Sequence, residues 1–324
     1  MVKYKNKKTK IRDIENTKII NRKRKGKILN TILKILLTIL ITIIITIAIV
    51  ILYFFIFDIE TKIPKEIEQE CKIETKQFMG RKIFILKDKE NISSEKYILY
   101  FHGGSYVAEA TQNHFNFLER LVKDTKYTII MPDYPLTPKY TYDDVFDMTV
   151  PLYKEIISKV NNKDLILMGD SAGGGLALGL YEKIATDFID IPSKTILISP
   201  WLDVKLQNNN INEVSKNDDI LSKEKLILAG LAYAGKDGMD KYLVNPINGD
   251  LSKLNNVVIF TGTYDILNPD AMLLKEKADK LGGNVNLKVY DKAKHIWLID
   301  NNSESEITNK AYNDLLKELR NEGE

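Results

Sequence analysis

A serine in a glycine-rich turn is the first feature of this sequence that could do chemistry. The apolar run Leu165–Met168 leads directly into Gly169–Gly173 (GDSAG), and a helical pattern follows. A strand, a G-x-S-x-G turn and a helix in this order form a nucleophile elbow, whose strained turn lifts the hydroxyl of Ser171 above the sheet. The flanking glycines let the backbone pass closely. The short motif alone is a weak signal, and its place between strand and helix favours a nucleophilic Ser171.

A second glycine turn could stabilise negative charge beside that serine. The apolar run Tyr97–Phe101 ends in His102–Gly104 (HGG), where glycines leave backbone N–H groups unobstructed. The N–H groups of Gly103 and Gly104, together with that of Ala172, would form an oxyanion hole. Loss of one such donor typically raises the barrier by about 3–4 kcal/mol. A plain Gly-Gly turn is the alternative interpretation, and the elbow nearby favours the oxyanion hole.

A serine nucleophile needs a base, and the chain offers few candidates. It contains three histidines: His102 in the glycine turn, His114 at the start of a helical pattern, and His295. Where a nucleophile elbow carries a triad, the chain order is serine, acid, histidine. His295 is the only histidine after Ser171, and it follows the expected strand Asn286–Tyr290. We therefore expect His295 to be the base.

The base in turn needs a carboxylate to orient it. Spacing alone does not select one, because many carboxylates lie between the serine and the histidine. Asp265 is favoured because it lies in the loop that leaves the apolar strand Val257–Phe260. Asp270 is the nearest rival, although its position at the start of a helix is equally explained by an N-cap.

The walls of a substrate pocket are harder to assign. Residues 204–245 are polar and Asn-rich and contain one helical segment, Leu221–Ala234, so they would insert between two strands as a lid. Ser105 and Tyr106, next to the glycine turn, are candidates for substrate contact. Trp297 is a further candidate, and a position in the core fits it equally well.

The elements that must position these residues alternate along the chain. Short apolar runs alternate with amphipathic stretches, which predicts a mostly parallel sheet with helices on both faces. The expected strands are Lys82–Leu86, Tyr97–Phe101, Tyr127–Met131, Leu165–Met168, Thr195–Ile198, Val257–Phe260 and Asn286–Tyr290. The expected helices are His114–Lys123, Asp143–Val160 (interrupted or kinked at Pro151), Ala172–Ala185, Ala271–Leu281 and Glu304–Leu319. Residues 81–324 then form one α/β domain, and 58–80 a linker or cap segment with a short helix from Pro64 to Glu74.

An apolar run near the N-terminus predicts a membrane span. Ile35–Phe57 is 23 residues without a charge. A helix of that length covers roughly 34 Å, against a hydrocarbon core of about 30 Å. Residues 1–27 carry twelve Lys or Arg against two acidic residues. We expect residues 1–27 to be a basic tail and residues 28–57 to be an anchor.

The basic tail sets the expected orientation. The positive-inside rule places residues 1–27 in the cytoplasm and 58–324 outside it, on a single-pass protein of the cell membrane. A basic tail could instead bind nucleic acid, but its position next to the apolar run disfavours that. A cleaved signal peptide is the other alternative, although its apolar region would be about 7–15 residues and end in small residues. The single cysteine, Cys71, cannot form an intramolecular disulfide, and no Cys/His spacing predicts a zinc site.

Taken together, these motifs resemble the hormone-sensitive-lipase-like branch of the α/β-hydrolases, which includes bacterial esterases and arylacetamide deacetylase. The HGG loop and the GDSAGG elbow match that branch, in order and at family-like spacing, within a resemblance that covers roughly residues 80–300. Three less generic stretches also match: Asp133–Pro138, Ile198–Asp203, and Asn245-Pro246 through Thr261–Leu267. The chain departs from the family pattern at Ser105, which replaces a third glycine, and at Pro135, which replaces an arginine. The segment before the sheet also looks short, so the cap is expected to be reduced.

The resemblance implies an α/β-hydrolase fold with a small helical cap, and hydrolysis of carboxylic esters through an acyl-enzyme without a cofactor or metal. Short-chain acyl or acetyl esters are the family-level expectation, and small-molecule or lipid esters remain open. A serine peptidase or amidase of the same fold would use the same triad. A non-catalytic, membrane-anchored binding protein is the third possibility, although such proteins usually lose a triad member. Neither the substrate nor the oligomeric state follows from the sequence.

Overall fold

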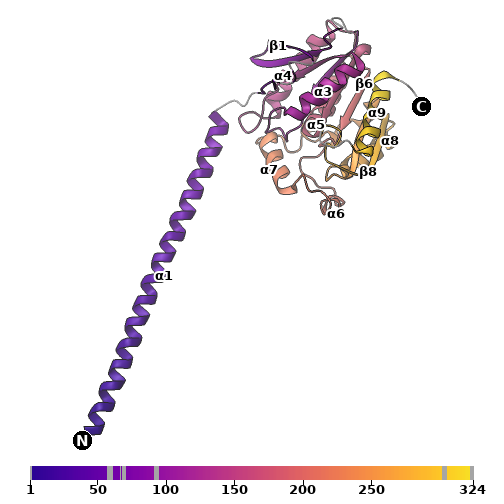
Figure 1. The fold of residues 1–324 in the computed structure, drawn as a ribbon. Helices are drawn as coiled ribbons and strands as arrows, with labels where there is room; N and C mark the ends of the chain where they lie inside the picture. The colour runs from indigo at the N-terminus through magenta and orange to yellow at the C-terminus, as the bar shows by residue number, and fades with distance from the viewer. Residues whose placement is uncertain are drawn as a thin grey trace. The chain divides into compact units, whose positions relative to one another are not determined.

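The N-terminal unit is one long helix, α1, which runs from Val2 to Ile56 (Figure 1). The protein is described by a computed structural model, which covers residues 2–56, 61–65, 67, 71–90, 95–300 and 305–321. By its internal contacts the chain divides into two units, Met1–Phe57 and Asp58–Glu324. Each unit is described by itself below.

The apolar part of α1 has the features of a membrane-spanning helix. Within the described side chains, the 29 residues Arg22–Val50 are long and apolar enough to cross a membrane, and none of the apolar window is buried. A signal sequence would pass the same test. The hydroxyls of Thr38, Thr42 and Thr46 each donate to the carbonyl four residues earlier, so these polar groups are satisfied within the helix. The basic tail is helical too, and is continuous with the apolar segment.

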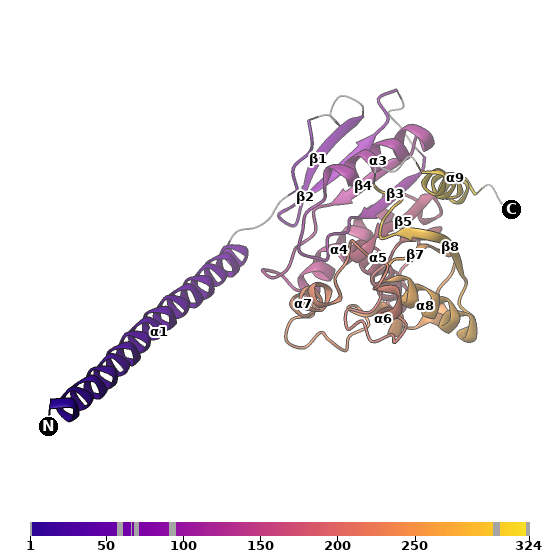
Figure 2. The ribbon, with the colours of Figure 1, turned by 60° about the horizontal axis from the view of Figure 1, so that its bottom comes forward.

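The second unit is built on one eight-stranded sheet, whose strand order is β1-β2-β4-β3-β5-β6-β7-β8 (Figure 2). Strand β2 pairs antiparallel with β1 and β4, and the remaining pairs are parallel. All seven predicted strands are present, so the expected mostly parallel sheet is confirmed. The strands are β1 Lys72–Phe78, β2 Arg81–Lys87, β3 Tyr97–Phe101, β4 Thr128–Pro132, β5 Leu165–Asp170, β6 Lys194–Ile198, β7 Val257–Tyr264 and β8 Val285–Lys294.

Strand β1 was missed by the sequence analysis. The predicted helix Pro64–Glu74 is wrong at its end, because Lys72–Glu74 open β1, while residues 66 and 68–70 lie outside the described part of the chain. The sequence of β1, KIETKQF, is mostly polar because it forms the sheet edge and is largely exposed. The boundary expected at residue 81 therefore falls inside the β1–β2 hairpin.

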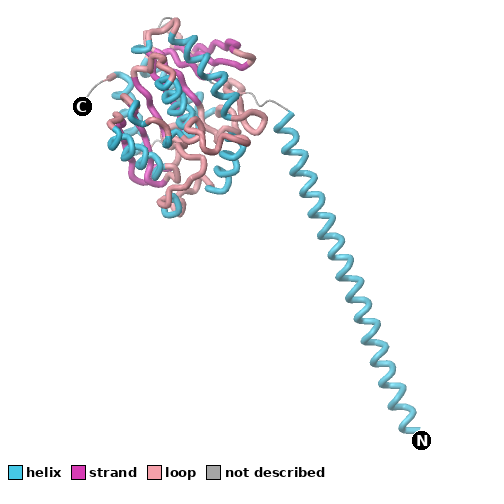
Figure 3. Tube along the Cα trace, turned by 180° about the vertical axis from the view of Figure 1, so that it is seen from behind, coloured by secondary structure: helices cyan, strands magenta, loops and turns pink. Residues whose placement is uncertain are grey.

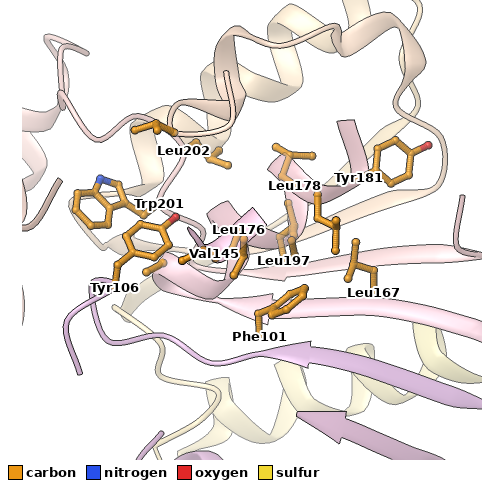
Figure 4. Packing of buried hydrophobic residues seen from close by; sticks show 14 of the residues in the cluster. Phe101, Tyr106, Val145, Leu167, Leu176, Leu178, Tyr181, Leu197, Trp201 and Leu202 are labelled. Carbon is orange, nitrogen blue, oxygen red and sulfur yellow. The ribbon is translucent and has the colours of Figure 1, made fainter. Parts of the chain in front are cut away.

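Helices cover both faces of the sheet (Figure 3). One apolar cluster packs α3 and α9 against one face, and a second packs α4, α5 and α8 against the other. Successive side chains of a buried strand alternate between the two clusters. In β5, Leu167 faces the second cluster (Figure 4), as does Leu165, whereas Ile166 and Met168 face the first. The helices are α3 Gln112–Thr125, α4 Tyr142–Ile157, α5 Ser171–Thr186, α8 Asn268–Leu281 and α9 Glu306–Arg320. Helix α4 continues through Pro151 without interruption.

The 204–245 insertion is mostly loop and turn. It contains the predicted helix as α7 (Lys223–Ala234) and one further turn of helix, α6 (Ile211–Val214). Before the sheet, the segment that precedes β1 is held in place at Thr61. The N–H and the hydroxyl of Thr61 both donate to the carboxylate of Asp133. The hydroxyl of Thr61 also accepts the N–H of Ala110, in the segment that follows the glycine turn.

Candidate active site

The elbow is formed where β5 meets α5. Strand β5 ends at Asp170 and the helix begins at Ser171, whose φ of 51° lies in the left-handed region that non-glycine residues rarely adopt. A Cβ on Gly173 would collide with the carbonyl oxygen of Phe101, and one on Gly169 with the backbone of Gly173. Both glycines of the motif are therefore needed for the chain to turn this tightly.

Three residues far apart in the sequence meet at this turn. The Nε2 atom of His295 lies 2.9 Å from the Oγ of Ser171, and its Nδ1 atom lies 3.0 Å from Oδ2 of Asp265. His295 directly follows β8, and Asp265 directly follows β7. All three side chains are buried. The sequence predicted these three positions, and the structure brings them into one hydrogen-bonded chain.

The surroundings of His295 favour its charged form. Burial is the largest single influence and lowers the pKa of the imidazole, but the negative charge and hydrogen bond of Asp265, together with the charges of Asp218 and Asp170, outweigh it. The pKa of His295 is therefore raised above its usual value of 6.5. An imidazole so placed is prepared to hold a proton taken from the serine.

Asp218, from the insertion, was missed by the sequence analysis. Its Oδ2 atom accepts the N–H of Ile266, the residue next to Asp265, at 2.8 Å. Its Oδ1 atom accepts the N–H groups of Ile220 and Leu221, which shapes its own loop. The insertion thus holds the loop that carries the acid. No local pattern marks Asp218, because its partner lies 48 residues further along the chain.

The glycine turn corrects one prediction. The N–H of Gly103 donates to Oδ1 of Asp170 at 2.9 Å, so it points at a carboxylate and cannot serve an oxyanion. Within residues 95–300, no hydrogen bond of the Gly104 or Ser105 N–H is found. The N–H of Ala172, in the first turn of α5, has no acceptor within its own helix. The available donors are therefore those of Gly104, Ser105 and Ala172.

Asp170, the variable residue of the G-x-S-x-G motif, ties the glycine turn to the elbow. Its buried carboxylate accepts the hydroxyl of Tyr100 at 2.6 Å and lies 3.3 Å from Nε2 of His114. The Nδ1 atom of His114 accepts the N–H of Thr111, so Nε2 carries the proton that faces Asp170. Burial raises the pKa of Asp170, but His114 and Tyr100 outweigh it and the pKa is lowered. An ionised Asp170 thus fixes the turn through Gly103.

The two other histidines have structural positions. His102 is fully buried, and its Nδ1 atom donates to the carbonyl of Gly103 at 2.7 Å. Burial lowers its pKa to about 4, so it is neutral at physiological pH. The hydroxyl of Tyr134 donates to the carbonyl of His102 at 2.7 Å, and the two rings stack. Neither His102 nor His114 is placed to act on Ser171.

The three residues predicted to contact the substrate, Ser105, Tyr106 and Trp297, lie in different environments. Tyr106 stacks on Tyr233 of α7 with ring centroids 3.6 Å apart, and its ring also lies 5.7 Å from that of Trp201 (Figure 4). It therefore joins the glycine turn to the 204–245 insertion. Ser105 is partly exposed and has a φ of 56°. Trp297 packs against Tyr290 in the apolar cluster of α3 and α9, which supports its core interpretation over a pocket wall.

Metal ligands are not gathered at this site. Among the residues that the structure describes, no group of three or more His, Cys, Asp or Glu side chains could hold a metal ion. The chemistry available to the described residues is a hydroxyl beside an imidazole, an imidazole beside a carboxylate, and N–H groups around a small volume.

The chain is similar to known proteins over this domain. A family model described as alpha/beta hydrolase fold matches residues 98–299. An esterase from Acinetobacter venetianus is 30% identical over 205 residues, which cover 62% of this chain and 67% of the relative. An acetyl-hydrolase from Streptomyces hygroscopicus is 25% identical over 201 residues, with coverage of 62% and 67%. The crystal structure of a Staphylococcus aureus protein, provisionally assigned as an esterase, superposes with a TM-score of 0.75 at 26% identity, covering 80% of this chain and 86% of that one.

Proposed function

This chain belongs to the α/β-hydrolase fold-3 family, the hormone-sensitive-lipase-like esterases, and is a carboxylic ester hydrolase, and on that premise we propose its mechanism and its location. We propose that it is a membrane-anchored serine esterase whose catalytic triad is Ser171, His295 and Asp265. The observation that carries the proposal is the unbroken chain of contacts from Ser171 Oγ through both ring nitrogens of His295 to Asp265.

The first step is attack on the ester carbonyl. His295 Nε2 accepts the proton of Ser171 as Oγ bonds to the carbonyl carbon. Asp265 keeps the ring in the tautomer that presents a bare Nε2 and stabilises the imidazolium that forms. The tetrahedral intermediate then collapses: the ester C–O bond breaks, the imidazolium of His295 gives its proton to the leaving alcohol, and the acyl group stays on Ser171. Water attacks this acyl-enzyme with His295 as base again, and the second intermediate collapses to release the carboxylic acid and return the proton to Ser171 Oγ.

The developing oxyanion is stabilised by backbone donors. The N–H groups of Gly104 and Ala172, with that of Ser105 in place of Gly103, are the donors we assign. Gly104 has a φ of 117° and Ser105 one of 56°, so consecutive N–H groups turn out of the strand direction. Asp170 holds this turn in place and so positions the donors before the reaction.

Small acyl groups suit the enclosed site best. The side chain of Ser171 is 4% exposed, and the stack of Tyr106 on Tyr233 and Trp201 occupies the volume beside the glycine turn. The name of one relative, an acetyl-hydrolase, agrees with acetyl esters. The apolar segment of α1 would hold the domain at the outer side of the cell membrane.

Fluorophosphonate labelling of the full chain tests the triad. We expect the probe to modify Ser171, and Ser171→Ala to lose both labelling and p-nitrophenyl acetate hydrolysis by at least a thousandfold. Ser158→Ala, at an exposed serine after α4, is the matched control and should label normally. Failure of the wild type to label, or undiminished labelling of Ser171→Ala, would contradict the proposal and favour a binding protein.

Substrate comparison separates an esterase from a peptidase. The purified full chain is assayed on p-nitrophenyl acetate and on peptide anilides. We expect ester hydrolysis to exceed anilide hydrolysis by at least a hundredfold in kcat/KM. Comparable rates would support the peptidase or amidase interpretation instead.

A further inference from the structure

A cavity of about 390 Å³ lies between the β1–β2 hairpin and the C-terminal half of α4. Its lining includes Tyr97 and Thr128, the first residues of β3 and β4. Ser171 instead follows the last residue of β5, which runs parallel to β3. The cavity is therefore at the opposite end of these strands from Ser171. A volume of about 300–1,000 Å³ is typical of small-ligand sites in proteins.

Apolar side chains of the sheet and of α4 line two sides of this cavity. Residues opposite each other in a ladder point to the same side of a sheet, and Ile85 of β2 pairs with Ile130 of β4. The wall comes from α4, where Leu152 and Ile156 are one helical turn apart. Phe78 of edge strand β1 and Val160, just after α4, are partly exposed at the margins.

Positive charge surrounds this apolar surface. Three lysines line the cavity, Lys76 on β1, Lys87 on β2 and Lys159 after α4, against a single acid, Glu155. Glu155 pairs with Lys159 at 2.6 Å, and Glu74 beside the cavity is shared by Lys87 and Lys72. With Lys72 and Glu74 included, four lysines stand against two glutamates. The rim therefore keeps a net positive charge.

We propose that this cavity binds a long-chain carboxylic acid, with its alkyl chain between the sheet and α4 and its carboxylate at the rim lysines. An alkyl chain would cover apolar surface on Phe78, Ile85 and Val160, which are partly exposed to water. A carboxylate would complement the excess of lysines, whereas a neutral lipid would leave it uncompensated. The site is distinct from the triad, and the inference does not depend on the proposed catalytic mechanism.

Photolabelling of the full chain tests this assignment. The Ser171→Ala protein, in phosphatidylcholine nanodiscs, is irradiated with palmitate that carries a diazirine in its chain, and cross-links are mapped by mass spectrometry. We expect labelled peptides within residues 76–87 and 152–160, and loss of that label with excess palmitate. Absence of label from both segments would overturn the proposal.

Variants of the cavity test its charge and its volume. The double variant Lys76→Glu/Lys159→Glu should reduce the cavity label at least fivefold, and Val160→Trp, which fills the margin, should do the same. Lys154→Glu changes an exposed lysine of α4 that does not line the cavity, and should stay within twofold of the parent. A diazirine analogue of hexadecanol should label at least fivefold less than palmitate. Undiminished labelling of the first two variants, or equal labelling by the alcohol, would overturn the assignment. Thermal unfolding midpoints near that of the parent show that each variant is folded.

Discussion

At the scale of single residues, His295 is governed by two opposing influences. Burial disfavours its charge, whereas the carboxylate of Asp265, 3.0 Å from Nδ1, favours it and outweighs burial together with Asp218 and Asp170. Because the base must be neutral to take a proton, a raised pKa shifts the onset of activity upward in pH. Activity is lost as the pH falls through the pKa of the folded protein.

The pH profile of kcat/KM on p-nitrophenyl acetate should show this. We expect the acidic limb of the wild type to have its midpoint above pH 6.5, the ordinary histidine value. Asp265→Asn removes the charge and leaves the burial, so its limb should move below that of the wild type. Its maximal rate should fall by about 10²–10⁴-fold, because the orienting carboxylate is lost. A limb that does not move on substitution would show that another group sets the pH dependence.

Asp270, the rival candidate for the acid, has a different position. It lies in the first turn of α8, is 1% exposed, and its Oδ2 atom has no hydrogen-bond partner among the described residues. Burial raises its pKa to about 6 and the negative charge of Asp203 adds to this, against the hydrogen bond of Asn208 and the positive charge of Lys277. It is neither the N-cap, which is Leu267, nor a partner of His295. Its carboxylate is therefore a source of instability at neutral pH.

Asp270→Asn should stabilise the protein above pH 6. A folded-state pKa above the ordinary 3.8 means that the folded protein binds this proton more tightly than the unfolded chain does. The free energy of unfolding therefore falls as the pH rises from about 4 through 6. An amide does not ionise, so the variant should gain up to about 3 kcal/mol at pH 8 and little at pH 4.

Thermal unfolding at pH 8 and pH 4 measures this difference. The matched control is Asp147→Asn, at an exposed aspartate of α4, which should change stability by less than about 0.5 kcal/mol. An Asp270→Asn protein that is less stable than the wild type at pH 8 would show that the hydrogen bond of Asn208 to the carboxylate outweighs the cost of its burial.

At the scale of elements, the β5–α5 turn depends on its glycines. A Cβ at position 173 would meet backbone atoms of Phe101 and His102, which cannot rotate away. To make room for the Cβ, the turn that carries Ser171 would have to move away from the glycine turn at His102–Gly104. We therefore expect Gly173→Ala to lower kcat/KM at least a hundredfold or to prevent accumulation of folded protein. Ester hydrolysis and the unfolding midpoint measure the two effects.

Gly179→Ala, in the same helix, provides the comparison. A Cβ there would meet the end of the Phe146 side chain at 3.0 Å and the carbonyl oxygen of Leu243 at 3.2 Å. Small shifts relieve such contacts, and alanine is the better helix former by about 1 kcal/mol. This variant should keep most of its activity. Wild-type activity in Gly173→Ala would show that the elbow tolerates a wider turn.

The sequence predicted the strands that contain apolar runs, and it predicted the site residues that follow one another in the expected chain order of serine, acid and histidine. Seven strands, six of them mostly buried and the seventh the edge strand β8, were predicted from their apolar residues. The other edge strand, β1, has mostly polar residues at its exposed positions and carries no such signal. Ser171, Asp265 and His295 each follow a strand, so their convergence could be expected. Two hydrogen bonds of the site could not be predicted: the one from the N–H of Gly103 to Asp170, and the one from the N–H of Ile266 to Asp218. Both depend on the direction of a side chain, which the spacing of residues in the sequence does not reveal.

At the scale of the whole molecule, the chain consists of two units of different character. The second carries the sheet, both apolar clusters and the triad residues, and the first is a single helix. The full chain should therefore remain in membranes after an alkaline carbonate wash, with the intact mass of all 324 residues. Protein lacking residues 2–57 should be released and should still label with a fluorophosphonate.

Orientation and processing are tested in the same preparation. Protease added to spheroplasts should digest residues 58–324 if the domain is outside the cytoplasm. Membrane-bound protein of full mass rules out a cleaved signal. A released product of lower mass, starting after α1, would show that the apolar helix is a signal sequence.

The hydrogen bond from Ile266 to Asp218 limits how this lid could be exchanged. A lid exchanged as a cassette would be expected to change specificity while the catalytic residues stay constant. Here the cassette contributes a carboxylate that braces the acid loop and adds to the charge around the base. A lid grafted from a relative would change selectivity and basicity together unless it restored an acceptor for that N–H. Exchange of residues 204–245 would therefore alter the surroundings of His295 as well as any contacts with the substrate.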